Sequence, residues 1–501
     1  MPQLPHEPIT RPKSAVHTTS TSARRRRRRR HVRRGALTIG VCAVLVAVAA
    51  CARSEGQAVS PARRAAPGPD LLLRAITPER LKAHLAALAA IADRNGGTRE
   101  AGTRGYQQSV AYVSRQLRRA GYRPRLQSFS FNRFRETRPP RFERLAPGAK
   151  RYRSGRDFVT MRYSGGGVVT APVAPVEPTS ASSACEASAF SGFPRGAVAL
   201  VRRGTCFMFL KARNARAAGA SGVLLANEGG PGRAAPVLGT LVRPGIGIPV
   251  LGISAALGAE LARAAQAGSV RVRIAVSAVT RRAKAVNVLA DLPGRDGTVL
   301  LGAHLDSVAI GPGINDNGSG SALVLEIARQ ARRLRVRPQH GLRFAFWGAE
   351  ELGLVGSSAY VQSLSAQQRA QLRAVLNFDM VGSPNFGRFV YDGDKAPAGS
   401  KQIEDSFRAY FAAHRQAVEE VSLEGSSDHA PFAQAGIPVG GLFTGADSRK
   451  EPGLARRFGG GANRPFDACY HQGCDTLSNV NVRVLGQMAD AAAFVALRLA
   501  G

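Results

Sequence analysis

Five short segments in the second half of the chain carry side chains that could hold metal ions or move protons. Two imidazoles together with three carboxylates make a mixed nitrogen and oxygen donor set that suits zinc. A catalytic zinc takes about three protein ligands and keeps one position open, so the set is large enough for two ions that share a carboxylate. The segments contain His304 with Asp306, Asp316, the pair Glu350 and Glu351, Asp379, and the neighbours Tyr470 and His471.

Each segment taken alone has a plainer interpretation. A single histidine after a strand is more often a core or capping residue than a ligand, and Asp379 alone could cap a helix. The run 315–318, Asn-Asp-Asn-Gly, is good turn chemistry, and two adjacent glutamates usually begin a solvated helix. Five such coincidences in one chain are improbable, so the joint pattern favours the metal site.

The elements around these segments alternate between strand and helix. This order predicts a mostly parallel α/β sheet covered by helices on both faces, in which ligands bind beyond the carboxyl ends of the strands. The candidate residues follow the expected strands, which is where that rule puts a site. Strands are expected at 298–303, 341–347, 374–379 and 437–443, and helices at 321–334, 357–363, 401–414 and 482–499.

The first part of the chain is less informative. Apolar residues at helical spacing predict a helix that begins near Thr77 and a second one over 106–120. Residues 130–165 are basic and are expected to be irregular. Residues 167–278 form a separate unit of short strands with helices over 209–218 and 254–265, and this unit has no histidine and therefore no evident catalytic set.

Charge is the most conspicuous feature of the composition. The 501 residues carry 70 Lys and Arg against 34 Asp and Glu, a net charge of +36. Eleven of the basic residues and one acid lie in residues 1–50, so the rest of the chain carries +26. The arginine run 24–30 has no interleaved aromatic residues and precedes an apolar segment, so we expect no nucleic-acid partner. The apolar fraction of 44% excludes wholesale disorder.

The N-terminus has the layout of an export signal. Basic residues precede sixteen uncharged, mostly apolar residues that end at Cys51, too short a stretch for a comfortable membrane span. The sequence Val-Ala-Ala-Cys ending at Cys51 resembles a bacterial lipobox, which would make Cys51 a lipid anchor at the cell surface. Cleavage after Ala49 and secretion is the alternative. A start of translation near Val32 would leave an ordinary signal.

Four cysteines lie outside this leader. An even number in an exported chain suggests two disulfides. Cys469 most simply pairs with Cys474, which leaves Cys185 for Cys206. No spacing indicates a thiolate zinc site.

Taken together, these motifs resemble those of the aminopeptidase Y-like di-zinc aminopeptidases of clan MH. The motifs are GAHLDS at 302–307, GINDNGSG at 313–320, FWGAEELG at 346–353 and CYHQGCD at 469–475, with NGGTR at 95–99. Residues 196–207 and 217–220 resemble the protease-associated (PA) domain, an accessory module. The expected organisation is a leader (1–50), a tether (51–76), an N-terminal peptidase part (77–166), an inserted PA domain (167–278) and the catalytic part (279–501).

The resemblance implies a role for each candidate residue. Asp316 would bridge two zinc ions, one also held by His304 and Asp379 and the other by Glu351 and His471. Glu350 would be the general base for a hydroxide held between the ions, and Tyr470 would stabilise the oxyanion. Asp306, by its position, could orient the imidazole of His304.

The implied function is an exported, zinc-dependent aminopeptidase that acts on peptide N-termini. A carboxypeptidase or an aminoacyl cyclase of the same fold, or a binding protein without metals, are the alternatives. The chain departs from the family pattern in residues 425–432. Some relatives have a basic residue near this segment, whereas this chain has serine. Asp428 and His429 in that segment are left out of the expected catalytic set.

Overall fold

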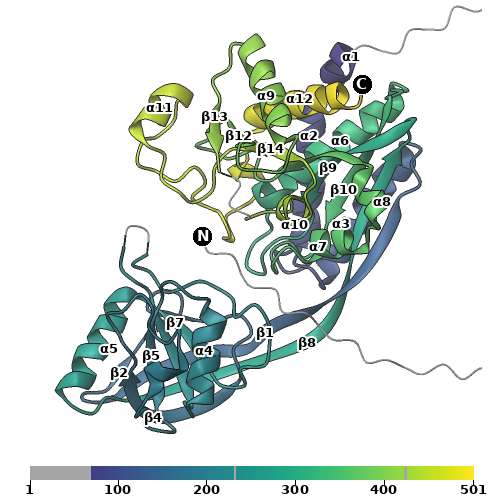
Figure 1. Ribbon diagram of the computed structural model, residues 1–501. Coiled ribbons are helices and arrows are strands. Elements are labelled where there is room, and N and C mark those ends of the chain that lie inside the picture. Colours follow the sequence, from purple (N-terminus) through teal and green to yellow (C-terminus); the bar gives the residue numbers. More distant parts are fainter. Residues whose placement is uncertain (1–68, 231–232, 423–425) are drawn as a thin grey trace, which may run out of the picture. The chain divides into compact units, whose positions relative to one another are not determined.

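A mixed, mostly parallel sheet forms the centre of the larger part of the molecule in the computed structural model, which describes residues 69–230, 233–422 and 426–501. Its strands run in the order β13-β12-β14-β11-β9-β10-β8 (Figure 1). The four inner strands are mutually parallel, as the alternation of elements predicts. The bounds are β8 (Arg271–Leu292), β9 (Asp296–His304), β10 (His340–Trp347), β11 (Leu372–Phe378), β12 (Phe389–Tyr391), β13 (Glu419–Val421) and β14 (Val439–Phe443).

Helices cover both faces of this sheet because its inner strands are apolar on both sides. On β9, Val299 and Leu301 pack into the core of one face and Leu300 into the core of the other. The first face carries α1 (Pro69–Ala75), α2 (Pro78–Asp93), α3 (Arg104–Arg119), α6 (Gly320–Arg333), α9 (Ser400–Ala413) and α12 (Val482–Leu499). The second carries α7 (Val355–Ser363) and α10 (Ala430–Gln434), and the short helix α8 (Ala366–Ala370), which has no buried residue, contacts β11. The short helix α11 (Pro452–Phe458) precedes the disulfide-closed loop.

A second group of strands comprises those of the unit expected over 167–278 together with β2 and β3, which precede residue 167. Strands β4, β5, β6 and β7 are parallel, and β3 lies antiparallel to β7. Two separate apolar clusters fill the space between these strands and their helices. The elements are β2 (Lys150–Arg151), β3 (Phe158–Thr160), β4 (Gly167–Pro175), η1 (Ala187–Phe190), β5 (Val198–Arg202), α4 (Met208–Ala217), β6 (Gly222–Ala226), β7 (Val250–Ile253) and α5 (Ala255–Ala267).

Two long strands connect the groups. β1 (Arg125–Ala146) pairs antiparallel with β8 along its whole length, and β8 also pairs with β4 and with β10. The expectation that 130–165 is irregular is therefore wrong. The sequence pattern did not indicate a strand here because the segment contains Pro139, Pro140 and many arginines. The strand forms nevertheless, because its pairing with β8 accommodates register shifts on either side of Arg138. The expected boundary at residue 278 lies inside β8.

The tether expected over 51–76 differs from the structure in its last part. Helix α1 occupies Pro69–Ala75, and Leu72 is buried at 1% exposure in the core with α6 and α12. The expected leader, the expected lipid-anchor residue Cys51, the alternative start near Val32 and the rest of the expected tether lie outside the described residues. Within the described ranges, no helix is both long and apolar enough to cross a membrane.

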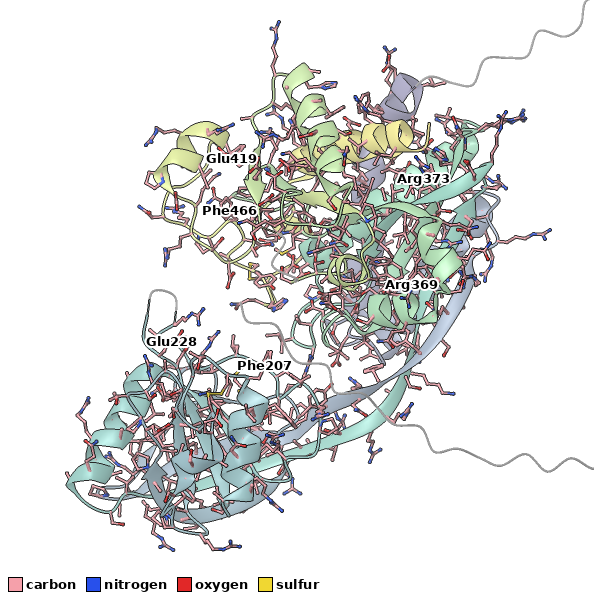
Figure 2. All side chains as sticks on the ribbon, in the orientation of Figure 1. Phe207, Glu228, Arg369, Arg373, Glu419 and Phe466 are labelled. Atoms are coloured by element: carbon pink, nitrogen blue, oxygen red, sulfur yellow. A yellow bond between two sulfur atoms is a disulfide. The ribbon has the colours of Figure 1, made fainter. Side chains whose placement is uncertain are left out.

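The two expected disulfides are confirmed. Cys185 is bonded to Cys206, next to Phe207, whose side chain is 81% exposed (Figure 2). Cys469 is bonded to Cys474, only five residues further along the chain. The second bond closes the loop that contains Tyr470 and His471.

Candidate metal centre

The expected site residues gather at the carboxyl ends of three parallel strands. His304 is the last residue of β9, Asp379 directly follows β11, and Glu350 and Glu351 follow β10 by three and four residues. Register pairs His304 with Trp347 on β10, so these ends lie at one level. The segment η2 (Ile314–Ser319), which precedes α6, supplies Asp316.

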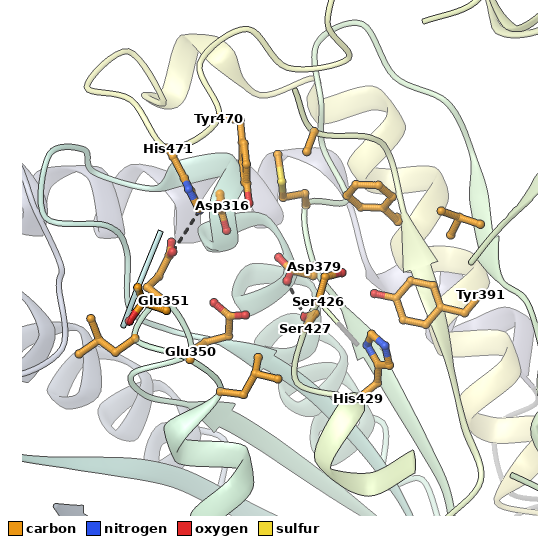
Figure 3. Close-up of a pocket in the computed structure, with 18 of the residues that line it drawn as sticks. Asp316, Glu350, Glu351, Asp379, Tyr391, Ser426, Ser427, His429, Tyr470 and His471 are labelled. Atoms are coloured by element: carbon orange, nitrogen blue, oxygen red, sulfur yellow. Dashed lines mark hydrogen bonds and ion pairs between the residues drawn. The ribbon is translucent and has the colours of Figure 1, made fainter. Parts of the chain in front are cut away.

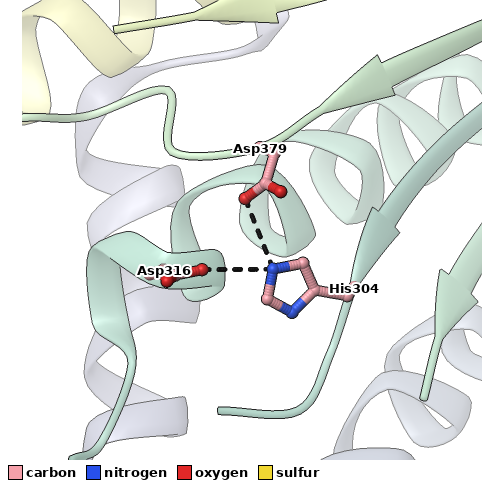
Figure 4. A group of neighbouring side chains, drawn as sticks. All are labelled: His304, Asp316 and Asp379. Atoms are coloured by element: carbon pink, nitrogen blue, oxygen red, sulfur yellow. Dashed lines mark ion pairs between the residues drawn. The ribbon is translucent and has the colours of Figure 1, made fainter. Parts of the chain in front are cut away.

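One group of donors surrounds the imidazole of His304. Its Nε2 lies 3.1 Å from Asp316 Oδ1 and 3.3 Å from Asp379 Oδ1 (Figure 4). His304 is 1% exposed, so water does not compete for these atoms. Three donors on three different elements thus meet within reach of a single ion.

A second group surrounds the imidazole of His471. Its Nε2 lies 3.2 Å from Asp316 Oδ2 and 3.1 Å from Glu351 Oε2 (Figure 3). Asp316 therefore belongs to both groups, with one carboxylate oxygen toward each imidazole. The buried Oε1 of Glu351 has no hydrogen-bond partner among the described residues. These donors fit zinc in type and number.

Protonation in the cluster follows from its excess of carboxylates. Burial opposes the charged form of His471, but the carboxylates of Asp316 and Glu351 raise its pKa to about 10. Burial acts in the same way on His304, yet Asp379 and Glu350 raise its pKa well above the ordinary value. Several carboxylates that lie close together thus hold positive charge, whether as protons or as metal ions.

Glu350 has a different environment from the adjacent Glu351. Burial first, and then the carboxylates of Glu351 and Asp428, raise the pKa of Glu350 well above its usual value, against the effect of His304. Its Oε2 is 3.9 Å from His304 Nε2, further than the oxygens of Asp316 and Asp379. A carboxyl group whose pKa is raised and that stands beside the donors is suited to proton transfer.

The backbone around the site is strained at three non-glycine residues. Ala349 (φ 58°) precedes Glu350, Met380 (φ 52°) follows Asp379, and His471 itself has φ 56°. Each left-handed residue costs on the order of 1 kcal/mol or more, and such strain concentrates at functional sites. The peptide bond between Asp316 and Asn317 is cis.

The metal-binding candidates border a cavity of about 390 Å³, which is lined by Asp316, Glu350, Glu351, Asp379 and His471 among others. Tyr470 lines it with its ring stacked on that of His471, the centroids 3.8 Å apart. Leu352, Met380 and Phe443 contribute apolar side chains to the wall, which also contains polar residues such as Ser427 and His429. All seven expected site residues therefore lie at the cavity or, for His304, directly behind it.

Asp306 contacts two of the site segments. Its main-chain oxygen is 3.3 Å from His304 Nδ1, and its carboxylate Oδ1 is further away at 3.7 Å. The same Oδ1 accepts the backbone N–H of Glu350 at 3.2 Å. Asp306 thus contacts both His304 and the Glu350 backbone, and it is the main-chain oxygen that lies nearer to the imidazole.

Two further residues at the site were not expected. Ser427 donates its hydroxyl to Asp379 Oδ2 at 2.6 Å and accepts from Asn377 at 2.9 Å. Arg99 is fully buried and donates to the carbonyl oxygens of Leu305, Pro312 and Gly313, in the loop between His304 and Asp316. The only sequence signal for Arg99 is the run NGGTR, which says nothing of its partners.

A third acidic group lies away from the cavity. It comprises Asp392, Asp394 and Glu404, and Lys401 Nζ lies 3.1 Å from Glu404 and 3.7 Å from Asp394. The lysine ammonium already supplies the positive charge there, so we assign no metal to this group.

Comparison with known proteins agrees with this geometry. Residues 287–496 match the model of peptidase family M28, and residues 169–261 match the PA domain. An aminopeptidase of Pseudomonas aeruginosa is 40% identical over 426 residues, which cover 82% of this chain and 78% of the relative. The chain belongs to peptidase family M28.

Two more similarities refine the assignment. The probable lipoprotein aminopeptidase LpqL of Mycobacterium tuberculosis is 37% identical over 82% of both chains. BSAP, a zinc aminopeptidase from Bacillus subtilis, superimposes with a TM-score of 0.61 and 26% identity, covering 84% of this chain and 94% of that structure. The protein is accordingly a zinc-dependent metallo-aminopeptidase with a PA domain, as the sequence predicts. This result sets aside the alternative of a binding protein.

Proposed function

We propose that this M28 enzyme is an exported aminopeptidase that uses two zinc ions to remove N-terminal residues from peptides. The observation that carries the proposal is the position of Asp316. Its two carboxylate oxygens lie 3.1 Å from His304 Nε2 and 3.2 Å from His471 Nε2. One carboxylate between two imidazole-carboxylate groups is the arrangement that a pair of ions requires.

The ligands divide between the two sides of Asp316. His304 and Asp379 would hold one zinc, and Glu351 and His471 the other. When bound, zinc lowers the pKa of water and polarises the carbonyl of the scissile bond. The strand ends fix His304, and Ser427 and Asn377 orient Asp379, so these side chains are arranged before any ligand arrives.

Glu350 would move the proton. Its raised pKa lets it take a proton from the attacking water and return it to the leaving amino group. Ala349 in the left-handed conformation sets the turn that presents Glu350 and Glu351 to the cavity.

Tyr470 would donate a hydrogen bond to the oxygen that becomes negative in the transition state. Burial, followed by the carboxylate of Asp316, raises the pKa of its hydroxyl above the usual value. The hydroxyl therefore keeps its proton at neutral pH and remains a donor.

Selectivity for the chain end follows from charge. A free α-amino group is positive or metal-bound, and the cavity presents Asp316, Glu350 and Asp379. An internal peptide bond has no such group to offer. The apolar wall formed by Leu352, Met380 and Phe443 favours an apolar first side chain.

The decisive test is a substrate panel assayed with zinc-stripped and zinc-restored enzyme. Peptides with free N-termini should release their first residue only after zinc is restored, and N-acetylated peptides should not react. Release from the C-terminus would instead favour a carboxypeptidase, and formation of a cyclic N-terminal residue a cyclase. Zinc-independent release would contradict the proposal.

Export is supported by the two disulfides, the basic and apolar leader, and the similarity to the lipoprotein LpqL. We propose that Cys51 is acylated and anchors the mature enzyme to the cell surface. Replacing Cys51 with Ala should abolish incorporation of labelled fatty acid. Unchanged labelling would contradict the anchor and leave secretion.

A further inference from the structure

Two buried aspartates that take no part in the proposed chemistry flank the disulfide-closed loop. Asp467 lies two residues before Cys469, and Asp475 follows Cys474 directly. They are 0% and 1% exposed, and neither forms an ion pair with a Lys, Arg or His side chain in the described part of the chain. Burial of a carboxylate is costly unless hydrogen bonds satisfy it, so their partners indicate their role.

Asp475 binds the backbone of the segment that carries Asp316. Its Oδ1 accepts the N–H of Asn315 at 2.8 Å, and its Oδ2 accepts the N–H of Asp316 itself at 2.9 Å. The main-chain oxygen of Asp475 accepts the N–H of Ile314 at 3.1 Å. Three successive amides of η2 are thus held by one residue at the end of the His471 loop.

Asp467 holds the other end of that loop. Its Oδ1 accepts the N–H of Cys469 at 2.8 Å, and its Oδ2 accepts from the side chain of Asn315 at 2.7 Å. Phe466, the preceding residue, is 4% exposed and packs against Phe389 with ring centroids 5.4 Å apart. The loop is therefore joined to η2 on both sides of the disulfide.

Two amide side chains complete the network. Asn479 Nδ2 donates to Asp467 at 2.9 Å and to Asp475 at 3.3 Å. Asn315 Oδ1 accepts the N–H of Gly382, three residues beyond Asp379, at 3.2 Å. All three segments that carry Asp316, His471 and Asp379 thus meet in one buried set of neutral donors and charged acceptors.

We propose that Asp475, supported by Asp467 and Asn479, is a positioning residue that holds Asp316 at a set distance from His471. This inference rests on the proposed role of those two residues as metal ligands. Ligand atoms must lie within a few tenths of an ångström of their ideal distances, so a loose Asp316 backbone would weaken binding. The proposed zinc site that includes His304 depends less on Asp475, because its other two ligands, His304 and Asp379, are fixed at the ends of β9 and β11.

The test is Asp475→Asn in the full enzyme, which keeps the size of the side chain. An amide nitrogen would then face a backbone N–H, removing one hydrogen bond and adding a repulsion. Zinc binding is measured by titration against a competing chelator, with metal content after dialysis. We expect the ion on the His471 side to bind about 10- to 100-fold more weakly and the ion on the His304 side, which also depends on Asp316, to weaken less. The visible spectrum of the cobalt-substituted enzyme should show a changed geometry at one ion.

Asp490→Asn is the matched control, because Asp490 lies half-buried on α12 and, among the described residues, no hydrogen bond joins it to the metal centre. This variant should bind both ions as the parent enzyme does. Circular dichroism of each variant in chelator reports whether the fold is intact. If Asp475→Asn does not fold, Asn479→Ala answers the question, because it removes donors to both aspartates without touching η2. We expect a smaller weakening there.

The inference would be overturned if a folded Asp475→Asn variant bound both ions as tightly as the parent enzyme. If that variant does not fold, the same result in Asn479→Ala would overturn it. Equal weakening of both ions would overturn the asymmetry between the two sides. The number of zinc ions that the parent enzyme binds distinguishes failure of this inference from failure of the proposed function. If the parent binds fewer than two zinc ions, the proposed function fails first.

Discussion

At the residue scale, two adjacent glutamates have different neighbours, and we propose a different task for each. Glu351 Oε2 lies 3.1 Å from His471, whereas Glu350 lies 3.9 Å from the nearest imidazole nitrogen and borders the cavity. One side chain is placed to bind a metal ion and the other to exchange a proton. The strained residue Ala349 precedes the pair.

Glu350→Gln should lower kcat at least about a hundredfold, because a group that transfers protons typically contributes 10²- to 10⁴-fold. Zinc content should stay at the parent value. The control is Glu351→Gln, which should lose zinc because it removes a ligand. Zinc content measured by mass spectrometry checks both variants. If the Glu350 variant loses zinc and the Glu351 variant keeps it, the two roles are exchanged.

A second residue-scale prediction concerns Asp490 on α12, away from the metal centre. Burial raises the pKa of its carboxyl to about 7, while His414 opposes the shift. An acid with a raised pKa binds more protons in the folded state, so its contribution lowers stability as pH rises from about 4 to about 7. Asp490→Asn removes this cost. Thermal denaturation should show a larger gain in Tm at pH 8 than at pH 4, and an equal gain at both would contradict the shift.

At the scale of elements, the sheet and one short loop supply the site in different ways. The parallel strands β9, β10 and β11 end at one level. Their hydrogen-bonded ends fix the backbone positions from which His304, Asp379 and the two glutamates extend. His471 comes from a loop with no regular secondary structure, closed by Cys469–Cys474. The conformation of this loop is held by the disulfide and by the hydrogen bonds that Asp467 and Asp475 accept.

The two disulfides should therefore differ in their effect on metal binding. Replacing Cys469 and Cys474 with Ser should weaken binding of the zinc held by His471 and lower stability by about 2 kcal/mol, as loop length predicts. Replacing Cys185 and Cys206 should lower stability by about 3 kcal/mol and leave zinc affinity unchanged, because that bond lies among the strands of the PA domain. Zinc titration and denaturant unfolding measure the two effects. Equal zinc affinity in both double variants would contradict the role of the loop.

At the scale of the whole molecule, acids are scarce but concentrated where the chemistry lies. The chain carries +36 overall, yet Asp316, Glu350, Glu351 and Asp379 border one cavity. The buried cation Arg99 lies near them, but it is bonded to carbonyl oxygens rather than to the carboxylates. Without metal, the repulsion between these carboxylates opposes folding.

Removing zinc should thus destabilise the entire enzyme as well as inactivate it. A ligand at a thousand times its Kd stabilises the folded state by about 4 kcal/mol, so a chelator should lower Tm by several degrees. Restoring zinc should recover both Tm and activity, and magnesium added in its place serves as the control. A Tm that does not respond to the chelator would contradict metal binding at this cluster.

The sequence by itself was enough to predict the residues that gather at the cavity, the strands that precede them, the PA domain and both disulfides. These features depend on local patterns: apolar runs, residue types that bind zinc, and cysteines close together in the chain. Only the tertiary structure decided that β1 pairs with β8, that Asp316 lies between His304 and His471, and that Asp475 holds the amides of Asn315 and Asp316 across about 160 residues. Hydrogen bonds between distant segments depend on how whole elements pack, and no local pattern encodes which buried carboxylate will meet which backbone amide.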